Sequence, residues 1–217
     1  MPSPDRLSLE QLEQHCEHWM SSRIGSDPAH DLAHIRRVVR SAKQLALAEG
    51  AELSIVVVAA WLHDAVCLSK DHPERRQASR LSAAWAQEQL QQLADFEADW
   101  LAGVAHAIEA HSFSAGIPPR SLEAKIVQDA DRLDALGAIG IARCMLVSGA
   151  LQRSLYAEQD PFCQQRPPDD QRYGLDHFYS KLLRLPEQMQ TRAAKQEAER
   201  RVAFMQAYLR ELAGELL

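Results

Sequence analysis

The sequence contains few cysteines, and they are scattered along the chain. Cys16, Cys67, Cys144 and Cys163 include no Cys-x-x-Cys pair. This spacing fits neither a thiolate zinc site nor a dense disulfide framework, because both need closely spaced cysteines. We therefore interpret the four residues as reduced thiols in a cytoplasmic protein.

The chain also has no long apolar run, no leader-like start and no positive net charge. Its most apolar run, from Ile55 to Leu62, is far too short to cross a bilayer. The first residues contain no basic-then-apolar segment of the kind that marks a secretory signal. The net charge is −6 with histidine neutral, which argues against a nonspecific DNA-binding or anionic-membrane surface. We expect no nucleic acid and no membrane as partners, whereas a phosphorylated small molecule and any oligomeric state stay open.

Hydrophobic residues make up 46% of the sequence and charged residues 25%, the balance of an ordinary globular protein. Apolar residues recur with helical spacing almost throughout, so we predict an all-α fold. The first helix starts after Ser8, without a complete capping box, and ends before Asp27-Pro28. The other helices are predicted near residues 28–48, 53–66, 75–93, 96–111, 121–132, 175–185 and 187–212.

One domain over residues 1–217 is the simplest organisation, with its core motifs at about 27–145 and a helical extension at about 146–217. The stretch from Gln159 to Gly174 contains three prolines among polar residues. We interpret it as a long loop and a candidate lid or ordered flap.

Histidines and aspartates gather in three of the predicted helices. His30 and His34 are spaced i, i+4, so both imidazoles can face one point. His63-Asp64 ends the apolar third helix, where an ionised carboxylate needs a cation or good hydrogen bonds. Asp129, Asp131 and Asp134 crowd a helix with apolar neighbours.

Each of these features alone has an ordinary explanation. A single histidine on a helix is more often a hydrogen-bonded core residue than a ligand, a His-Asp dipeptide is common by chance, and an acidic cluster is usually a solvated face. Their joint occurrence in order, each beside apolar residues, favours a metal site.

The pattern resembles the HD phosphohydrolase superfamily, whose signature is a His, then a His-Asp pair, then a distant Asp. The stretches that carry the resemblance are His30-Asp-Leu-Ala-His34, Ala60-Trp-Leu-His-Asp64 and Asp129-Ala-Asp-Arg-Leu-Asp134. The run from Asp129 to Arg143, with Ala110-His-Ser-Phe113, is similar to a small bacterial branch of stand-alone HD hydrolases. The resemblance implies a single-domain helical bundle of the HD-domain type.

The resemblance also implies the metal ligands, which are His34, His63, Asp64 and Asp131. Asp131 is preferred to its acidic neighbours because the family aspartate precedes a basic residue and a leucine. Mixed nitrogen and oxygen donors suit a divalent ion, with Mn²⁺ or Mg²⁺ favoured and Fe²⁺, Co²⁺ or Ni²⁺ as alternatives.

Four further residues are candidates around such a metal. Lys70 and His111 are candidate catalytic residues for the phosphate, although a solvated lysine and a helix-terminal histidine that pairs with carbonyls are equally plausible. His30 and Arg143 are candidate substrate-binding residues, with a structural salt bridge as the alternative for Arg143. His106 reads as an ordinary helix residue.

The expected activity is metal-dependent hydrolysis of a nucleotide, in particular cleavage of a nucleoside triphosphate between the α and β phosphorus atoms. The glutamate that some nucleotidase relatives carry after the His-Asp pair is missing, because Ala65 to Ser69 follow Asp64. Two alternatives stay open: a phosphomonoesterase or phosphodiesterase acting on another small metabolite, and a non-catalytic HD-type interaction module.

Overall fold

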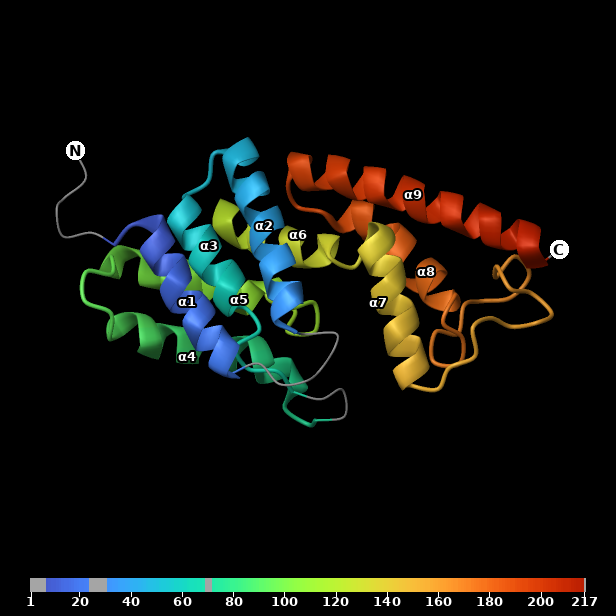
Figure 1. The fold of residues 1–217 in the computed structure, drawn as a ribbon, viewed down its shortest axis with the longest axis horizontal. Helices are drawn as coiled ribbons and strands as arrows, with labels where there is room; N and C mark the ends of the chain where they lie inside the picture. The colour runs from blue at the N-terminus through green and yellow to red at the C-terminus, as the bar shows by residue number, and fades with distance from the viewer. Residues whose placement is uncertain (1–6, 24–30, 69–71, 217) are drawn as a thin grey trace. The chain divides into compact units, whose positions relative to one another are not determined.

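The computed structural model describes residues 7–23, 31–68 and 72–216. Within these ranges the regular secondary structure is helical, apart from one isolated β-bridge between Ser154 and Tyr173. This confirms the all-α prediction. The chain divides into two compact units, Met1–Asp131 and Arg132–Leu217, coloured blue to yellow-green and yellow to red in Figure 1. The single HD-type domain remains a prediction.

The first unit contains the helices that precede the boundary. They are α1 (Leu9–Arg23), α2 (Leu32–Glu49), α3 (Leu53–Leu62), α4 (Ala78–Gln91), α5 (Leu101–His111) and most of α6 (Leu122–Leu133), with short 3₁₀ turns at Arg75–Gln77 and Ala98–Trp100. The predicted helices are all present, but several are shorter than expected because a 3₁₀ turn or a bend replaces their ends.

Helix α1 begins with a complete capping box, contrary to the sequence-based expectation. The Gln11 amide donates to Ser8 Oγ at 3.2 Å, and the Ser8 amide donates to Gln11 Oε1 at 2.8 Å. This reciprocal pair satisfies two backbone donors that a helix N-terminus leaves open.

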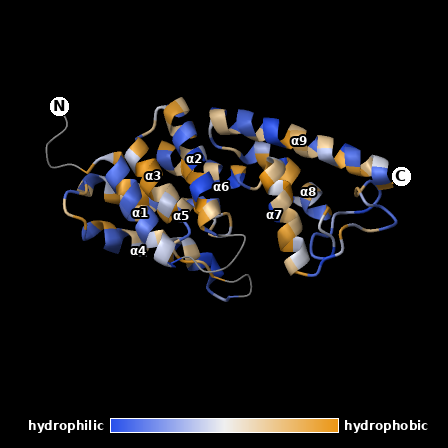
Figure 2. Cartoon of the chain, viewed as in Figure 1, coloured by the Kyte–Doolittle hydropathy of each residue, from blue (hydrophilic) through white to orange (hydrophobic). Residues whose placement is uncertain are grey.

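The core of the first unit is built around α3, which packs against α1, α2 and α5. Its residues from Val56 to Leu62 are all buried, and the helix is drawn mainly in the orange of hydrophobic side chains in Figure 2. A helix that is apolar on every side must be surrounded by other elements. Because α3 is central, the His63-Asp64 pair at the end of this helix lies toward the interior of the first unit.

The second unit consists of the end of α6 followed by α7 (Gly137–Ala150), α8 (Asp176–Ser180), a 3₁₀ segment (Leu182–Gln188) and α9 (Arg192–Leu216). Helix α9 packs against α7 and the 3₁₀ segment through a stripe of buried residues at Ala194, Ala198, Val202, Met205 and Leu209. Their spacing of three or four residues places them on one face.

The long connection between α7 and α8 is non-helical, as predicted for residues 159–174. Asp160 accepts three backbone amides, from Gln164 at 2.9 Å, Gln165 at 2.8 Å and Arg166 at 3.1 Å. Arg166 in turn donates through Nη2 to Asp176 Oδ1 at 2.8 Å. These bonds give the loop an internal framework, and its role as a lid stays a prediction.

Among the described residues, no single helix is long and apolar enough to cross a membrane, although α6 and α7 taken together meet that criterion by length and composition.

Candidate metal centre

His34 lies in the first turn of α2. The side chain of Asp31 caps this helix by accepting the His34 amide at 2.7 Å. The cap fixes where the helix starts and therefore the direction in which His34 points. The His34 side chain is 1% exposed, so its imidazole lies inside the first unit.

His63 and Asp64 follow the last residue of α3, with His63 at the C-cap in a helical conformation. The His63 ring is completely buried, and its Nδ1 lies 2.7 Å from the carbonyl oxygen of Ala60. When Nδ1 carries the proton and donates to that carbonyl, Nε2 presents a lone pair at the other side of the ring, as metal-binding histidines do.

His111 ends α5 in the same manner. Its Nδ1 lies 2.6 Å from the carbonyl oxygen of Ile108, and its side chain is 7% exposed. The alternative interpretation of this residue, a terminal histidine that satisfies a helix carbonyl, is therefore correct for Nδ1. Its Nε2 is directed elsewhere, at 3.5 Å from Asp64 Oδ1.

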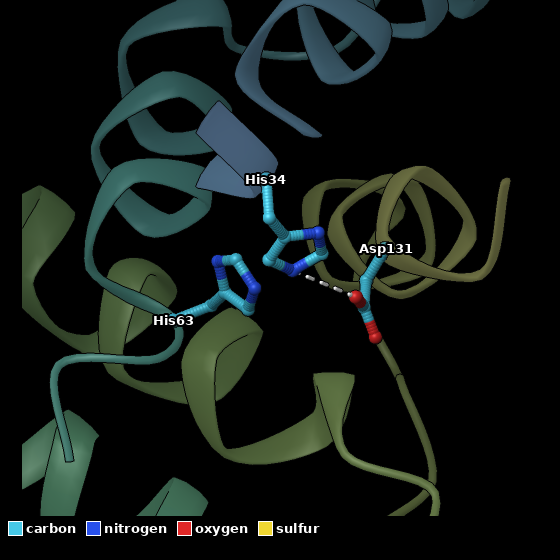
Figure 3. Close-up of side chains that lie close together, drawn as sticks. All are labelled: His34, His63 and Asp131. Atoms are coloured by element: carbon cyan, nitrogen blue, oxygen red, sulfur yellow. Dashed lines mark ion pairs between the residues drawn. The ribbon is translucent and has the colours of Figure 1, made fainter. Parts of the chain in front are cut away.

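These side chains converge on one region within the first unit. His34 Nε2 lies 3.5 Å from Asp131 Oδ1 and 3.9 Å from Asp64 Oδ2, and His63 Nε2 lies 3.5 Å from Asp64 Oδ2. Figure 3 shows His34 from α2, His63 from the end of α3 and Asp131 from α6 turned toward one another. The ligand atoms of His34, His63 and Asp131 all lie within 4.8 Å of one another, and so do those of His63, Asp64 and His111.

The donor set fits a divalent ion. Nitrogen and oxygen ligands sit about 2.0–2.2 Å from such an ion, so two ligands of one ion are separated by roughly 3–4 Å. The measured separations of 3.5 and 3.9 Å fall in this range. In addition, the buried Nε2 of His63 has no hydrogen-bond partner among the described residues. A metal ion would satisfy that lone pair directly.

The two histidines that flank Asp64 differ in their preferred charge. Burial lowers the pKa of His63, and this effect outweighs the neighbouring Asp64 and Asp131 carboxylates. Burial opposes protonation of His111 as well, but the Asp64 and Asp131 carboxylates and the Ile108 carbonyl together outweigh burial and raise the pKa of His111. His63 is therefore the better neutral ligand, and His111 holds a proton more readily.

The sequence also pointed to His30, Lys70 and Arg143 as site residues. His30 and Lys70 are outside the described residues. Arg143 belongs to α7 in the second unit, where its Nη1 pairs with the buried carboxylate of Asp134. His106 accepts the Arg120 amide through Nε2 at 3.0 Å, as an ordinary helix residue would. The ligand assignments and the roles of Lys70, His111, His30 and Arg143 remain predictions.

Two side chains that the sequence did not single out hold the segment after Asp64. Arg23 donates through Nε to the Ala65 carbonyl at 2.7 Å and lies over the Trp85 ring at 4.5 Å. Ser82 Oγ accepts the Val66 amide at 3.0 Å. Both contacts join residues far apart in the chain, so no local pattern in the sequence could have revealed them.

Comparison with known proteins identifies the family of this arrangement. A family model described as the HD domain matches residues 31–136. The protein YpgQ of Bacillus subtilis (strain 168) is 35% identical over 214 residues, which cover 94% of this chain and 93% of YpgQ. The crystal structure of YpgQ in complex with ADP has a TM-score of 0.68 at 32% identity, and the match covers 95% of this chain and 94% of that one.

A crystal structure described as an HD-superfamily hydrolase, from Bacillus thuringiensis, has a TM-score of 0.69 at 35% identity and covers 95% of both chains. The similarity thus extends over nearly the whole length of the chain. The chain belongs to the HD superfamily of metal-dependent phosphohydrolases.

Proposed function

We propose that this hydrolase cleaves nucleoside triphosphates between the α and β phosphorus atoms and releases a nucleoside monophosphate and pyrophosphate. The observation that carries the proposal is the convergence of three imidazoles and two carboxylates inside the first unit. The relative YpgQ, which matches nearly the full chain, has been crystallised with ADP, and this supports a nucleotide as the substrate class.

In this proposal His34, His63, Asp64 and Asp131 hold one divalent ion, with Mn²⁺ or Mg²⁺ preferred by the mixed nitrogen and oxygen donors. When bound, such an ion lowers the pKa of a coordinated water and polarises a phosphoryl oxygen. The carbonyls of Ala60 and Ile108 hold Nδ1 of His63 and His111 respectively, so the two Nε2 atoms keep their directions.

Other residues of the chain bind and orient the phosphates. His111, whose Nε2 lies 3.5 Å from Asp64 Oδ1, contacts a phosphate oxygen or protonates the leaving group. Lys70 contributes a compact positive charge against the charge that develops in the transition state. His30 and Arg143 are proposed as substrate contacts. A pyrophosphate leaving group carries several negative charges, and positive groups near it would compensate them. A neutral alcohol leaving group would need less compensation.

Methylene-bridged analogues identify the bond that is cut, because a carbon bridge cannot be hydrolysed. With Mn²⁺ added, the β,γ-methylene analogue of a triphosphate should be consumed and the α,β-methylene analogue should not. Phosphorus NMR of the unmodified triphosphate should show monophosphate and pyrophosphate as the first products.

The opposite pattern would reject cleavage between the α and β atoms. If nucleoside diphosphate and orthophosphate appear first, the bond between the β and γ phosphorus atoms is the one that is cut. If no triphosphate is consumed while another phosphoester is, the phosphomonoesterase or phosphodiesterase alternative replaces this proposal. An Asp64→Ala protein provides the background rate for each compound.

A further inference from the structure

Two carbonyls at the C-terminal end of α5 are satisfied by side chains. A helix leaves its last four carbonyls without partners inside the helix. Here the Ile108 carbonyl lies 2.6 Å from His111 Nδ1, and the Ala110 carbonyl accepts Gln128 Nε2 at 2.7 Å. Ser112 follows in an extended conformation, with φ −74° and ψ 126°, so the helix does not continue. The last turn of α5 thus depends on these two hydrogen bonds.

Gln128 belongs to α6, three residues before Asp131. Residues spaced i, i+3 on a helix lie one turn apart on the same side. The bond from Gln128 to Ala110 therefore joins the turn of α5 that carries His111 to the turn of α6 that carries Asp131. It spans 18 residues of sequence and is fully buried.

Gln128 places a side-chain amide in a buried environment, where an unsatisfied polar atom is unfavourable. The residue is 4% exposed, and its Oε1 has no hydrogen-bond partner among the described residues. An unsatisfied buried amide oxygen destabilises a folded protein, and an apolar side chain of similar length would avoid that cost. The bond that Nε2 makes to Ala110 is the contribution that an apolar side chain could not replace.

We propose that Gln128 is a positioning residue that holds the C-terminal turn of α5, and with it the His111 imidazole, against the site. The functional consequence rests on the role proposed above for His111, whereas the structural consequence does not. Without the bond, the Ala110 carbonyl loses its donor and the turn frays. His111 then loses its fixed Nδ1 partner, and its Nε2 is no longer held 3.5 Å from Asp64 Oδ1.

The test replaces Gln128 by methionine, which keeps the length of the side chain and removes the amide. Long-range ¹H–¹⁵N NMR of the histidine rings in the Mg²⁺-loaded protein reports which ring nitrogen carries the proton. In the wild type His111 should show one sharp set of ring signals with Nδ1 protonated. In Gln128→Met the His111 signals should broaden or shift toward a mixture, whereas those of His106 stay unchanged.

The matched control is Ser121→Ala, which removes a side-chain hydrogen bond to the Ala124 amide at the other end of α6. This variant should lose stability without a change in the His111 signals. Identical His111 spectra in the wild type and Gln128→Met, or the same change in both variants, would overturn the inference.

Kinetics supply a second readout for the same two variants. With Mn²⁺ and a triphosphate, Gln128→Met should lower kcat about 10-fold, the lower range for loss of a residue that orients a site group, with KM and metal content unchanged. If the wild type turns over no triphosphate, the proposed function fails, and the NMR comparison still decides the role of Gln128.

A measurement on the wild type keeps the inference testable if Gln128→Met does not fold. The side-chain amide protons of Gln128 should exchange with solvent far more slowly than those of the exposed Gln92. Equal exchange rates would show that the bond to Ala110 does not persist in solution, and the inference would be wrong.

Discussion

One carboxylate in each compact unit, Asp64 in the first and Asp176 in the second, is surrounded by a different set of groups. In the second unit, Asp176 is fully buried and is matched by Arg166, which donates from two nitrogens, and by the Asp169 amide. In the first unit, Asp64, whose side chain is 18% exposed, lies 3.5–3.9 Å from the imidazoles of His34, His63 and His111.

This difference separates a structural ion pair from a binding site. A guanidinium carries a permanent charge and satisfies a carboxylate in a fixed, two-bond geometry. Imidazoles that hold a proton on Nδ1 leave Nε2 as a lone pair, so an arrangement of imidazoles and carboxylates is a set of ligands for a cation. Aspartate thus takes part in an ion pair in the second unit and stands among possible metal ligands in the first.

The largest expected effect is that of removing Asp64. Asp64→Ala should abolish metal retention and lower kcat/KM. The loss should correspond to several kcal/mol of activation free energy, because the ion supplies most of the charge stabilisation in a metal hydrolase. The helical fold should persist, since α3 is held by its apolar contacts. Elemental analysis of purified protein and circular dichroism check both parts. Stoichiometric metal and normal turnover in this variant would show that the ligand assignment is wrong.

Replacing Lys70 tests whether its positive charge contributes to catalysis on a phosphorylated substrate. Lys70→Ala should leave the metal content intact and cost about 2–4 kcal/mol in kcat/KM, the range for one preorganised donor. Lys70→Arg should restore part of the loss, because a forked guanidinium differs from a compact ammonium. Steady-state kinetics of the three proteins measure both effects. Unchanged kinetics for Lys70→Ala would show that Lys70 is a solvated lysine without a role in catalysis.

The counterpart of Asp64 in the second unit is Asp176. Asp176→Asn removes the charge opposite Arg166 and should lower the free energy of unfolding by about 2–3 kcal/mol, below the range for a fully buried pair because Arg166 is 24% exposed. Metal content per folded molecule should not change. Urea unfolding followed by circular dichroism measures the loss, and a loss of metal instead would break the distinction between the two units.

The smallest effect concerns the surface of α9, where Glu197 pairs with Arg200 and Arg201 at 2.7 Å. Hydrogen bonds from Arg200, then Arg201, lower the pKa of Glu197 from 4.5 to about 2. A lowered pKa contributes stability above the unfolded-state value, and this contribution disappears as the pH falls through about 2.

Glu197→Gln should therefore destabilise the protein at pH 7 by less than about 1 kcal/mol, because Arg200 is 72% exposed and water reaches the partly exposed Glu197 and screens its ion pairs. The difference from wild type should shrink as the pH falls below 4.5. Thermal unfolding of both proteins across this range measures it. A difference that grows with acidity would contradict the sign of the shift.

The sequence predicted most of the helices, but it did not single out α7, and it placed the helix ends less well. The apolar run from Ile55 to Leu62 was correctly assigned to a buried helix, although its β-branched residues also suit a strand. The ends were harder, because 3₁₀ turns at Arg75–Gln77 and Ala98–Trp100 depend on packing rather than on local preference.

His111 illustrates the same limit within the site. Its position at the end of a helix was visible in the sequence, and that position accounts for the bond from Nδ1 to the Ile108 carbonyl. Its distance from Asp64 was not visible, because α3 and α5 are separated by α4 and two connections.

The residue types and their order along the chain, a His, then a His-Asp pair, then an Asp, favoured a metal site, and the resemblance to the HD superfamily that they carry predicted a metal-dependent phosphohydrolase. Spacing within one helix is a local property, and the sequence determines it directly. Which side chains meet across helices depends on packing between α2, α3, α5 and α6, and a contact such as Gln128 to Ala110 leaves no periodic signal. The tertiary structure alone decided that His111 joins the four predicted ligands and that Asp134 pairs with Arg143.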